Sequence, residues 1–206
     1  MGPKSNRQTG MRAHIAAAAA RLMAEDGIDD FALAKRKAAR QLGAADTHAL
    51  PRNDEIEAEL RAYRSLYQAE EHPQLTDELR RIALDAMRTL GRFTPYLTGP
   101  VLKGIAGPCA EIDLQLFPDS AKDVEIFLLD RNIPFTTQEG RRYAGDRAHA
   151  VGLIRLQWQG VPVKLAVFDQ RDERVALKTS AAGRVGERAG IAEVEGLLAI
   201  NKQLKV

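Results

Sequence analysis

Residues 96–117, YLTGPVLKGIAGPCAEIDLQLF, decide the fold that we expect, because the spacing of apolar residues changes within them. In their last part apolar and polar residues alternate, with Ile112, Leu114 and Leu116 on one face and Glu111, Asp113 and Gln115 on the other. Such alternation is typical of a strand with one buried face. It places both carboxylates on the same face. Residues 96–105 are also β-like, although Gly99-Pro100 interrupts them.

Downstream of this stretch, the pattern predicts a helix, then strands, then a last helix. Ser120 is a suitable N-cap for a helix over residues 121–132. Apolar runs at 151–158 and 161–168 flank Gln159-Gly160 and predict a β-hairpin. The last helix contains four apolar residues, Ile191, Val194, Leu197 and Leu198.

Upstream, the apolar residues recur about every four positions, which indicates helices. We expect His72-Pro73 to break the chain and Thr76 to open a helix that ends at Gly91. Asp54 and Glu57 resemble a capping pair at the start of an earlier helix. Three helices are predicted before the break, over residues 15–27, 30–43 and 54–67.

These patterns predict two domains. Residues 1–72 form an all-helical N-terminal module, and residues 73–206 form an α+β (or α/β) domain in which helices pack on a sheet. A chain of 206 residues with 45% hydrophobic residues is long enough for one sizeable core, or for a compact domain with a helical appendage.

Composition limits the classes of function. With 30 Lys and Arg against 28 Asp and Glu, the chain has no overall charge that would attract polyanions. The single cysteine, Cys109, excludes an internal disulfide framework and a thiolate-rich zinc site. The longest apolar run, residues 15–20, is far too short to span a bilayer and lacks the layout of a secretory signal. We therefore expect a soluble, cytoplasmic protein with no membrane contact.

The glycine turn and the acidic pair form the most informative motif. Gly99 and Pro100 are followed by ten residues and then by Glu111-Ile112-Asp113. This spacing resembles the nucleotidyltransferase superfamily, including small bacterial members, and the resemblance covers roughly residues 76–200. It implies a mixed sheet with flanking helices. It also implies that the glycine turn holds a nucleoside triphosphate, that the two acids bind Mg²⁺, and that a third acid on a later strand is a metal ligand or base.

The residues themselves are consistent with that chemistry, because Mg²⁺ prefers oxygen ligands and usually shares them with substrate phosphates. The expected activity is Mg²⁺-dependent transfer of a nucleotidyl group from a nucleoside triphosphate to an unknown acceptor. The expected catalytic residues are Glu111, Asp113 and Asp169, of which Glu111 and Asp113 bind the metal. The expected nucleotide-binding residues are Gly99, Pro100, Lys103, Lys164, Lys178 and Arg184.

Three departures from the family pattern leave an alternative open. Pro100 has no N–H to offer a phosphate, and Glu111 stands where the family usually has aspartate. The third acid is missing from its expected strand, where Lys164 is a candidate inward position and Asp169 is the nearest carboxylate. Lys164 could also replace a metal with its own charge. The alternative is therefore a catalytically inactive, transferase-like binding or regulatory module.

Nucleic-acid binding by the N-terminal helices is a second, weaker alternative. Residues 15–43 are similar to the opening of TetR-type repressors, but no recognition-helix pattern follows, because residues 44–51 are loop-like. Residues 1–43 contain eight basic side chains, Lys4, Arg7, Arg12, Arg21, Lys35, Arg36, Lys37 and Arg40, against four acidic ones, Glu25, Asp26, Asp29 and Asp30. This local excess of positive charge favours a polyanionic partner.

Overall fold

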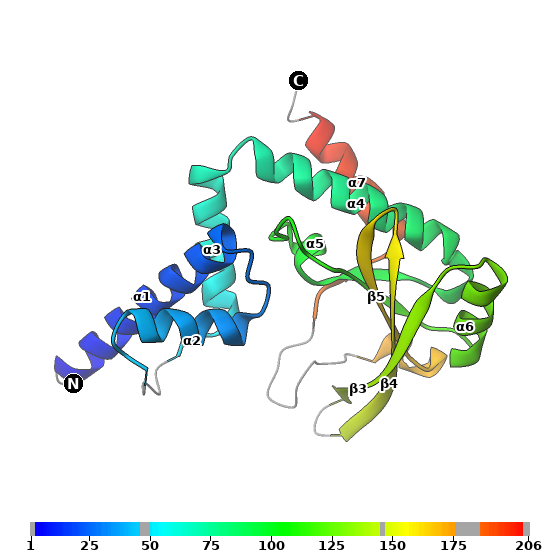
Figure 1. Ribbon diagram of the computed structural model, residues 1–206, viewed down its shortest axis with the longest axis horizontal. Helices are drawn as coiled ribbons and strands as arrows, with labels where there is room; N and C mark the ends of the chain where they lie inside the picture. The colour runs from blue at the N-terminus through cyan, green and yellow to red at the C-terminus, as the bar shows by residue number, and fades with distance from the viewer. Residues whose placement is uncertain (1–2, 46–49, 145–146, 176–185, 204–206) are drawn as a thin grey trace. The chain divides into compact units, whose positions relative to one another are not determined.

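The computed structural model describes residues 3–45, 50–144, 147–175 and 186–203, and the chain divides into two compact units (Figure 1). Unit 1 contains residues Met1–Leu75 together with the loop Ile105–Cys109. Unit 2 contains residues Thr76–Gly104 and Ala110–Val206. The chain therefore passes from unit 2 into unit 1 and back again between its first two strands.

Unit 1 is built from helices. Its elements are α1 (Pro3–Glu25), α2 (Phe31–Gln41), α3 (Asn53–Tyr67) and the beginning of α4 (Glu71–Thr89). Its core is rich in alanine and lies where α1 packs on α2 and α3, with Ile15, Ile56 and Leu60 almost fully buried. Ile105, from the inserted loop, joins the same core.

The starts of two helices differ from the sequence-based expectation. The helix α4 begins at Glu71, so His72-Pro73 lies within its first turn instead of breaking the chain. Proline is tolerated there because the first N–H groups of a helix have no partner inside it. In α3 the N-cap is Arg52, and its backbone N–H donates to Glu55 Oε2 at 2.7 Å. Asp54 and Glu57 are thus not the capping pair.

Unit 2 contains a mixed six-stranded sheet in the order β3-β4-β5-β2-β1-β6. Its strands are β1 (Tyr96–Thr98), β2 (Ile112–Leu116), β3 (Phe135–Ala144), β4 (Arg147–Trp158), β5 (Val161–Val167) and β6 (Arg188–Ala189). The central pair β2 and β5 is parallel, and the other neighbours are antiparallel. The expected hairpin is confirmed, and Gln159 (φ 49°) and Gly160 (φ 81°) form its turn.

Helices accompany this sheet. They are the remainder of α4, α5 (Gly99–Lys103), α6 (Ala121–Asp130) and α7 (Ile191–Gln203), with short 3₁₀ turns η1 (Gly91–Phe93) and η2 (Gln170–Arg174). The helices α4 and α7 lie side by side, and Asn201 Nδ2 donates to buried Asp77 Oδ1 at 2.7 Å (Figure 1). The expected mixture of helices and sheet is confirmed. Within the described residues, no helix is both long and apolar enough to cross a membrane.

The segment expected to be β-like over residues 96–105 changes direction after three residues. The strand β1 ends at Thr98, Gly99 adopts φ +71°, and α5 follows with Pro100 in its first turn. A left-handed glycine turns the chain at little steric cost, and the fixed φ of proline suits the start of a helix. The short helix therefore begins directly beside β2, where Asp113 lies opposite Thr98.

Candidate functional site

The two acidic residues meet a lysine from the neighbouring parallel strand. Glu111 directly precedes β2, Asp113 lies within it, and the register of β2 and β5 pairs Asp113 with Lys164. Lys164 Nζ donates to Glu111 Oε2 at 3.0 Å and forms a close ion pair with Asp113 Oδ1. One ammonium group thus bridges the two carboxylates.

A second cation completes this group from strand β4, where Arg155 pairs in register with Lys164. Arg155 Nε donates to Glu111 Oε1 at 3.2 Å, and its Nη1 donates to Gln138 Oε1 at 2.8 Å. We call Glu111, Asp113, Lys164 and Arg155 the paired-acid cluster. Its two acids and two bases sum to no formal charge.

The environment keeps Lys164 charged. Burial disfavours its ammonium form, but attraction to Asp113 and hydrogen bonding to Asp113 and Glu111 outweigh burial and raise the pKa of Lys164 above its usual value. The side chains of Lys164 and Asp113 are each only 23% exposed. The ion pair therefore persists throughout the neutral pH range.

The glycine turn lies against the same cluster. A Cβ added to Gly99 would come within 2.5 Å of Asp113 Oδ2, closer than any side chain tolerates. The backbone at residue 99 therefore approaches the Asp113 carboxylate closely, and only glycine permits it with φ +71°. The glycine turn and the acidic pair, which form the sequence motif, therefore lie close together in the fold.

Several of the expected site residues lie elsewhere. Asp169 caps η2, where its Oδ1 accepts from the Arg171 backbone N–H at 2.9 Å. It lies five residues beyond Lys164, which is about 16 Å of extended chain at roughly 3.3 Å per residue. Among the described residues, Asp169 forms no metal-holding group with Glu111 and Asp113, and its role as a third acid stays a prediction. Lys103 ends α5, and Pro100 lies in its first turn.

The two remaining expected residues, Lys178 and Arg184, lie outside the described residues. Within the part of the chain that the structure describes, no group of three or more His, Cys, Asp or Glu residues could hold a metal ion. Glu111 and Asp113 are the oxygen ligands that Mg²⁺ would need, but the Lys164 ammonium lies against both of them. As arranged, the paired-acid cluster does not fit a divalent cation.

Arg155 was missed by the reasoning from sequence, although a signal for it exists. The Gln159-Gly160 turn pairs Trp158 with Val161, and counting back along both strands pairs Arg155 with Lys164. A two-residue turn sets the register of the whole hairpin. The position of Arg155 could therefore have been read from the turn alone.

Comparisons with models of known families, with curated proteins and with solved structures found no match for this chain.

Proposed function

We propose that unit 2 is a nucleotidyltransferase-like domain in which Lys164 takes the place of the metal, so that the chain acts as a binding or regulatory module. The observation that carries this proposal is the bridge from Lys164 Nζ to both Glu111 and Asp113. A transferase of this kind needs its paired acids for Mg²⁺. Here an internal ammonium group occupies the position between them.

Electrostatics favours the internal cation over a metal ion. Lys164 is tethered to the adjacent strand, so it competes at a high effective concentration and has no translational entropy to lose. Its raised pKa keeps it charged at neutral pH. Arg155 then neutralises the remaining negative charge of the cluster. An incoming Mg²⁺ would have to displace Lys164 and would meet a site with no net negative charge.

The likeness to a transferase domain has its own structural support. The backbone at Gly99 approaches Asp113 closely, and the acidic pair lies at the start of a central strand, so the two parts of the motif are neighbours. The third acid of the family lies on a later strand, and here Lys164 lies directly across from Asp113 on β5. A cation in place of an anion at that position would disfavour a bound metal ion.

Calorimetric titration of the full-length protein with MgCl₂ and MnCl₂ tests the proposal. We expect no heat of binding for the wild type, and any nucleotide binding should be the same with Mg²⁺ and with EDTA. The variant Lys164→Asp should gain Mn²⁺ binding, because a third carboxylate then faces the pair. Lys122→Asp makes the same charge change at an exposed position on α6 and should gain none.

If Lys164→Asp does not fold, Lys164→Ala tests the same point with Mn²⁺ paramagnetic resonance, because it leaves the two acids without their ammonium. Pyrophosphate release by the wild type with Mg²⁺ and any of the four nucleotides, abolished by Asp113→Asn, would overturn the proposal. It would establish instead Mg²⁺-dependent nucleotidyl transfer to an acceptor still to be found. Failure of both Lys164 variants to bind Mn²⁺ would also contradict a role for Lys164 as the replacement cation.

A further inference from the structure

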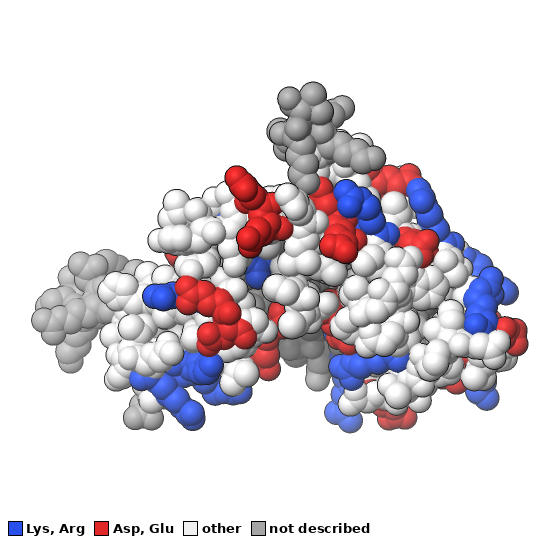
Figure 2. Space-filling view, turned by 45° about the horizontal axis from the view of Figure 1, so that its top comes forward, with Lys and Arg blue, Asp and Glu red and all other residues white. Residues whose placement is uncertain are grey.

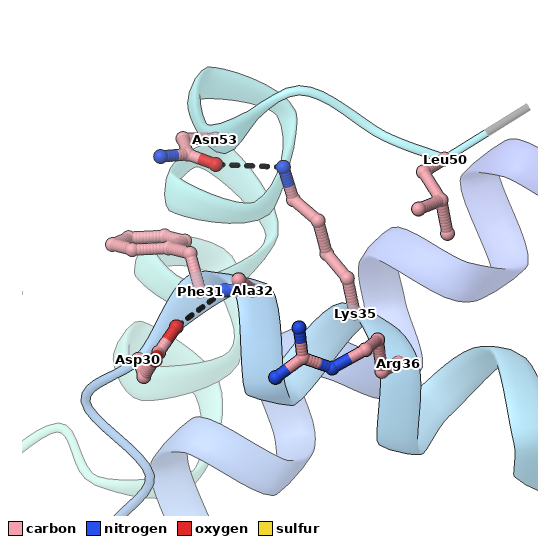
Figure 3. Close-up of a pocket in the computed structure, with 7 residues that line it drawn as sticks. All are labelled: Asp30, Phe31, Ala32, Lys35, Arg36, Leu50 and Asn53. Carbon is pink, nitrogen blue, oxygen red and sulfur yellow. Dashed lines mark hydrogen bonds between the residues drawn. The ribbon is translucent and has the colours of Figure 1, made fainter. Parts of the chain in front are cut away.

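A second candidate site, a pocket beside a lysine side chain, lies within unit 1. A pocket of about 450 Å³ opens between the first turns of α2 and the start of α3. We call it the α2 pocket. Figure 3 shows the Lys35 side chain rising from α2 to Asn53, with Phe31 on one side of the opening and Leu50 on the other. The size lies within the range of small-molecule sites.

Lys35 is partly buried, and among the described residues no carboxylate forms an ion pair with it. Its Nζ donates to the neutral Asn53 Oδ1 at 2.7 Å. Burial, assisted by repulsion from Arg12, lowers the pKa of Lys35, whereas Glu55 and Asp54 only partly offset this effect. The ammonium group therefore lacks a charged partner in a position where it has lost part of its water.

The neighbouring acids are engaged by other cations. Glu55 accepts from Arg12 through both of its oxygens, and Asp54 accepts from Arg52 at 3.0 and 3.1 Å. Both carboxylates attract the Lys35 ammonium group through space, and among the described residues Lys35 forms no ion pair. The charge of Lys35 is thus left available to an external anion.

Arg36 adds a second positive charge to the same opening. It is exposed, and within residues 3–45, 50–144, 147–175 and 186–203 it makes no hydrogen bond or ion pair. Figure 3 shows its guanidinium group beside the pocket, below Lys35. Figure 2 shows a group of basic side chains at the lower left, in unit 1. Two cations that form no ion pair with the described part of the chain therefore border one cavity.

The Asp30 carboxylate limits where an anion can bind in the pocket, and apolar side chains form part of the pocket wall. Asp30 Oδ1 accepts from the backbone N–H groups of Ala32 and Leu33, at 2.7 and 3.1 Å, so these first amides of α2 are already satisfied. An anion would therefore bind at Lys35 and Arg36 and avoid the Asp30 carboxylate. Phe31 and Leu50 offer an aromatic ring and an aliphatic side chain to the body of a ligand.

We propose that the α2 pocket binds a small organic anion, a molecule with an apolar, ring-sized body and one carboxylate or phosphate group. Lys35 and Arg36 hold the oxyanion through charge-assisted hydrogen bonds, and Phe31 and Leu50 contact the apolar body. This site is separate from the paired-acid cluster, so the proposal stands whether or not the proposed function of unit 2 is correct.

Titrations followed by ¹⁵N-edited NMR of the full-length protein test this proposal. The probes are phenyl phosphate and benzoate, which share the proposed chemistry, together with inorganic phosphate and uncharged benzyl alcohol. We expect the amide signals of Ala32, Lys35 and Asn53 to move in a saturable manner with phenyl phosphate or benzoate. The two single-feature probes should bind about tenfold more weakly or not at all, because each loses either the charge or the apolar contact.

Three charge-removing variants of one helix identify the site. Lys35→Gln and Arg36→Gln should each weaken binding of the better probe by about tenfold, as expected for the loss of one charge-assisted hydrogen bond. Lys37→Gln removes the same charge one position further on, but Lys37 pairs with Asp26 at 3.1 Å and does not line the pocket. It should change the affinity less than about twofold, the effect of a distant, screened charge.

Two results would overturn the proposal. The first is no saturable shift with either organic anion at 10 mM. The second is an equal loss of affinity in all three variants, which indicates a diffuse basic surface. In that case a DNA duplex is titrated next, and binding that weakens steeply with salt would assign the surface to nucleic acid instead.

Discussion

Lys35 in unit 1 and Lys164 in unit 2 are both half-buried, yet their surroundings have opposite effects. Burial lowers the pKa of Lys35, whose ammonium group donates to a neutral amide oxygen of Asn53. For Lys164 the attraction of Asp113 and Glu111 outweighs burial, and its pKa is raised. The difference lies in the number of carboxylates each ammonium contacts, not in how deeply it is buried.

The positive charges of Lys164 and Lys35 therefore have different roles. Lys164 completes a cluster without formal net charge and leaves nothing for an external ion to compensate. Lys35 contributes an uncompensated charge next to a cavity, which an external anion would stabilise. Removing one partner of a buried ion pair leaves the other charge uncompensated and destabilises the fold, whereas a partly buried charge without a counter-ion favours an anionic ligand.

The largest difference in stability is expected between the variants Lys164→Met and Lys35→Met. Methionine keeps an unbranched side chain but removes the charge. Lys164→Met should lower the free energy of unfolding of unit 2 by about 2–3 kcal/mol, somewhat less than for a fully buried pair, because Glu111 and Asp113 lose their shared cation. Lys35→Met should change stability by less than about 0.5 kcal/mol, because no charged partner is abandoned. Denaturation followed by fluorescence of Trp158, the one tryptophan, reports on unit 2, and circular dichroism reports on the helices of unit 1.

The stability cost of Lys164→Met should change with pH in one direction only. The folded-state pKa of Lys164 lies above its unfolded value of 10.5, so its stabilising effect is complete below pH 10.5 and is lost as the pH rises through the folded-state pKa. The cost of Lys164→Met should therefore be constant near neutrality and shrink only in strong alkali. A cost that disappears between pH 6 and 8 would contradict the ion pair.

An intermediate effect is expected from Gly99→Ala, which pushes Asp113 away from Lys164. Gly160→Ala is the matched control, because Gly160 also has positive φ but has nothing within 4 Å of an added Cβ. The control should cost about 1 kcal/mol from backbone strain alone. Gly99→Ala should cost about 1 kcal/mol more, because the added carbon overlaps Asp113 Oδ2. Equal costs in urea denaturation would mean that the close approach is not maintained in solution.

The smallest effect is expected from Glu55→Gln, which changes the charge around Lys35. Hydrogen bonding to Arg12 lowers the pKa of Glu55 to about 2, so its contribution to stability is present above the unfolded value of 4.5 and is lost as the pH falls toward 2. The pair is only partly buried, with side chains 33% and 34% exposed, so we expect Glu55→Gln to lower the melting temperature of unit 1 at pH 7 by no more than about 3 °C. At pH 2 most of the difference between the wild type and the variant should be gone, because Glu55 is then largely at its folded-state pKa of about 2.

Local patterns predicted much of the fold, and their failures have local causes. The hairpin around Gln159-Gly160 and the strand at Ile112–Leu116 follow from alternation and turn residues, which act over a few positions. The continuous strand expected over residues 96–105 failed because apolar spacing over so short a stretch does not distinguish β1 followed by α5 from one strand. The insertion of Ile105–Cys109 into unit 1 has no local signal at all.

For the candidate site, the sequence alone determined that Glu111 and Asp113 share one strand face beside a glycine turn, because alternation and the special freedom of glycine are properties of neighbouring residues. Only the tertiary structure decided what faces them. The pairing of β2 with β5 joins residues 51 positions apart, Asp113 and Lys164, and places an ammonium group between the acids. The partner of a strand is set by the packing of the whole sheet, and it is this partner that changes an apparent metal site into a closed ion cluster.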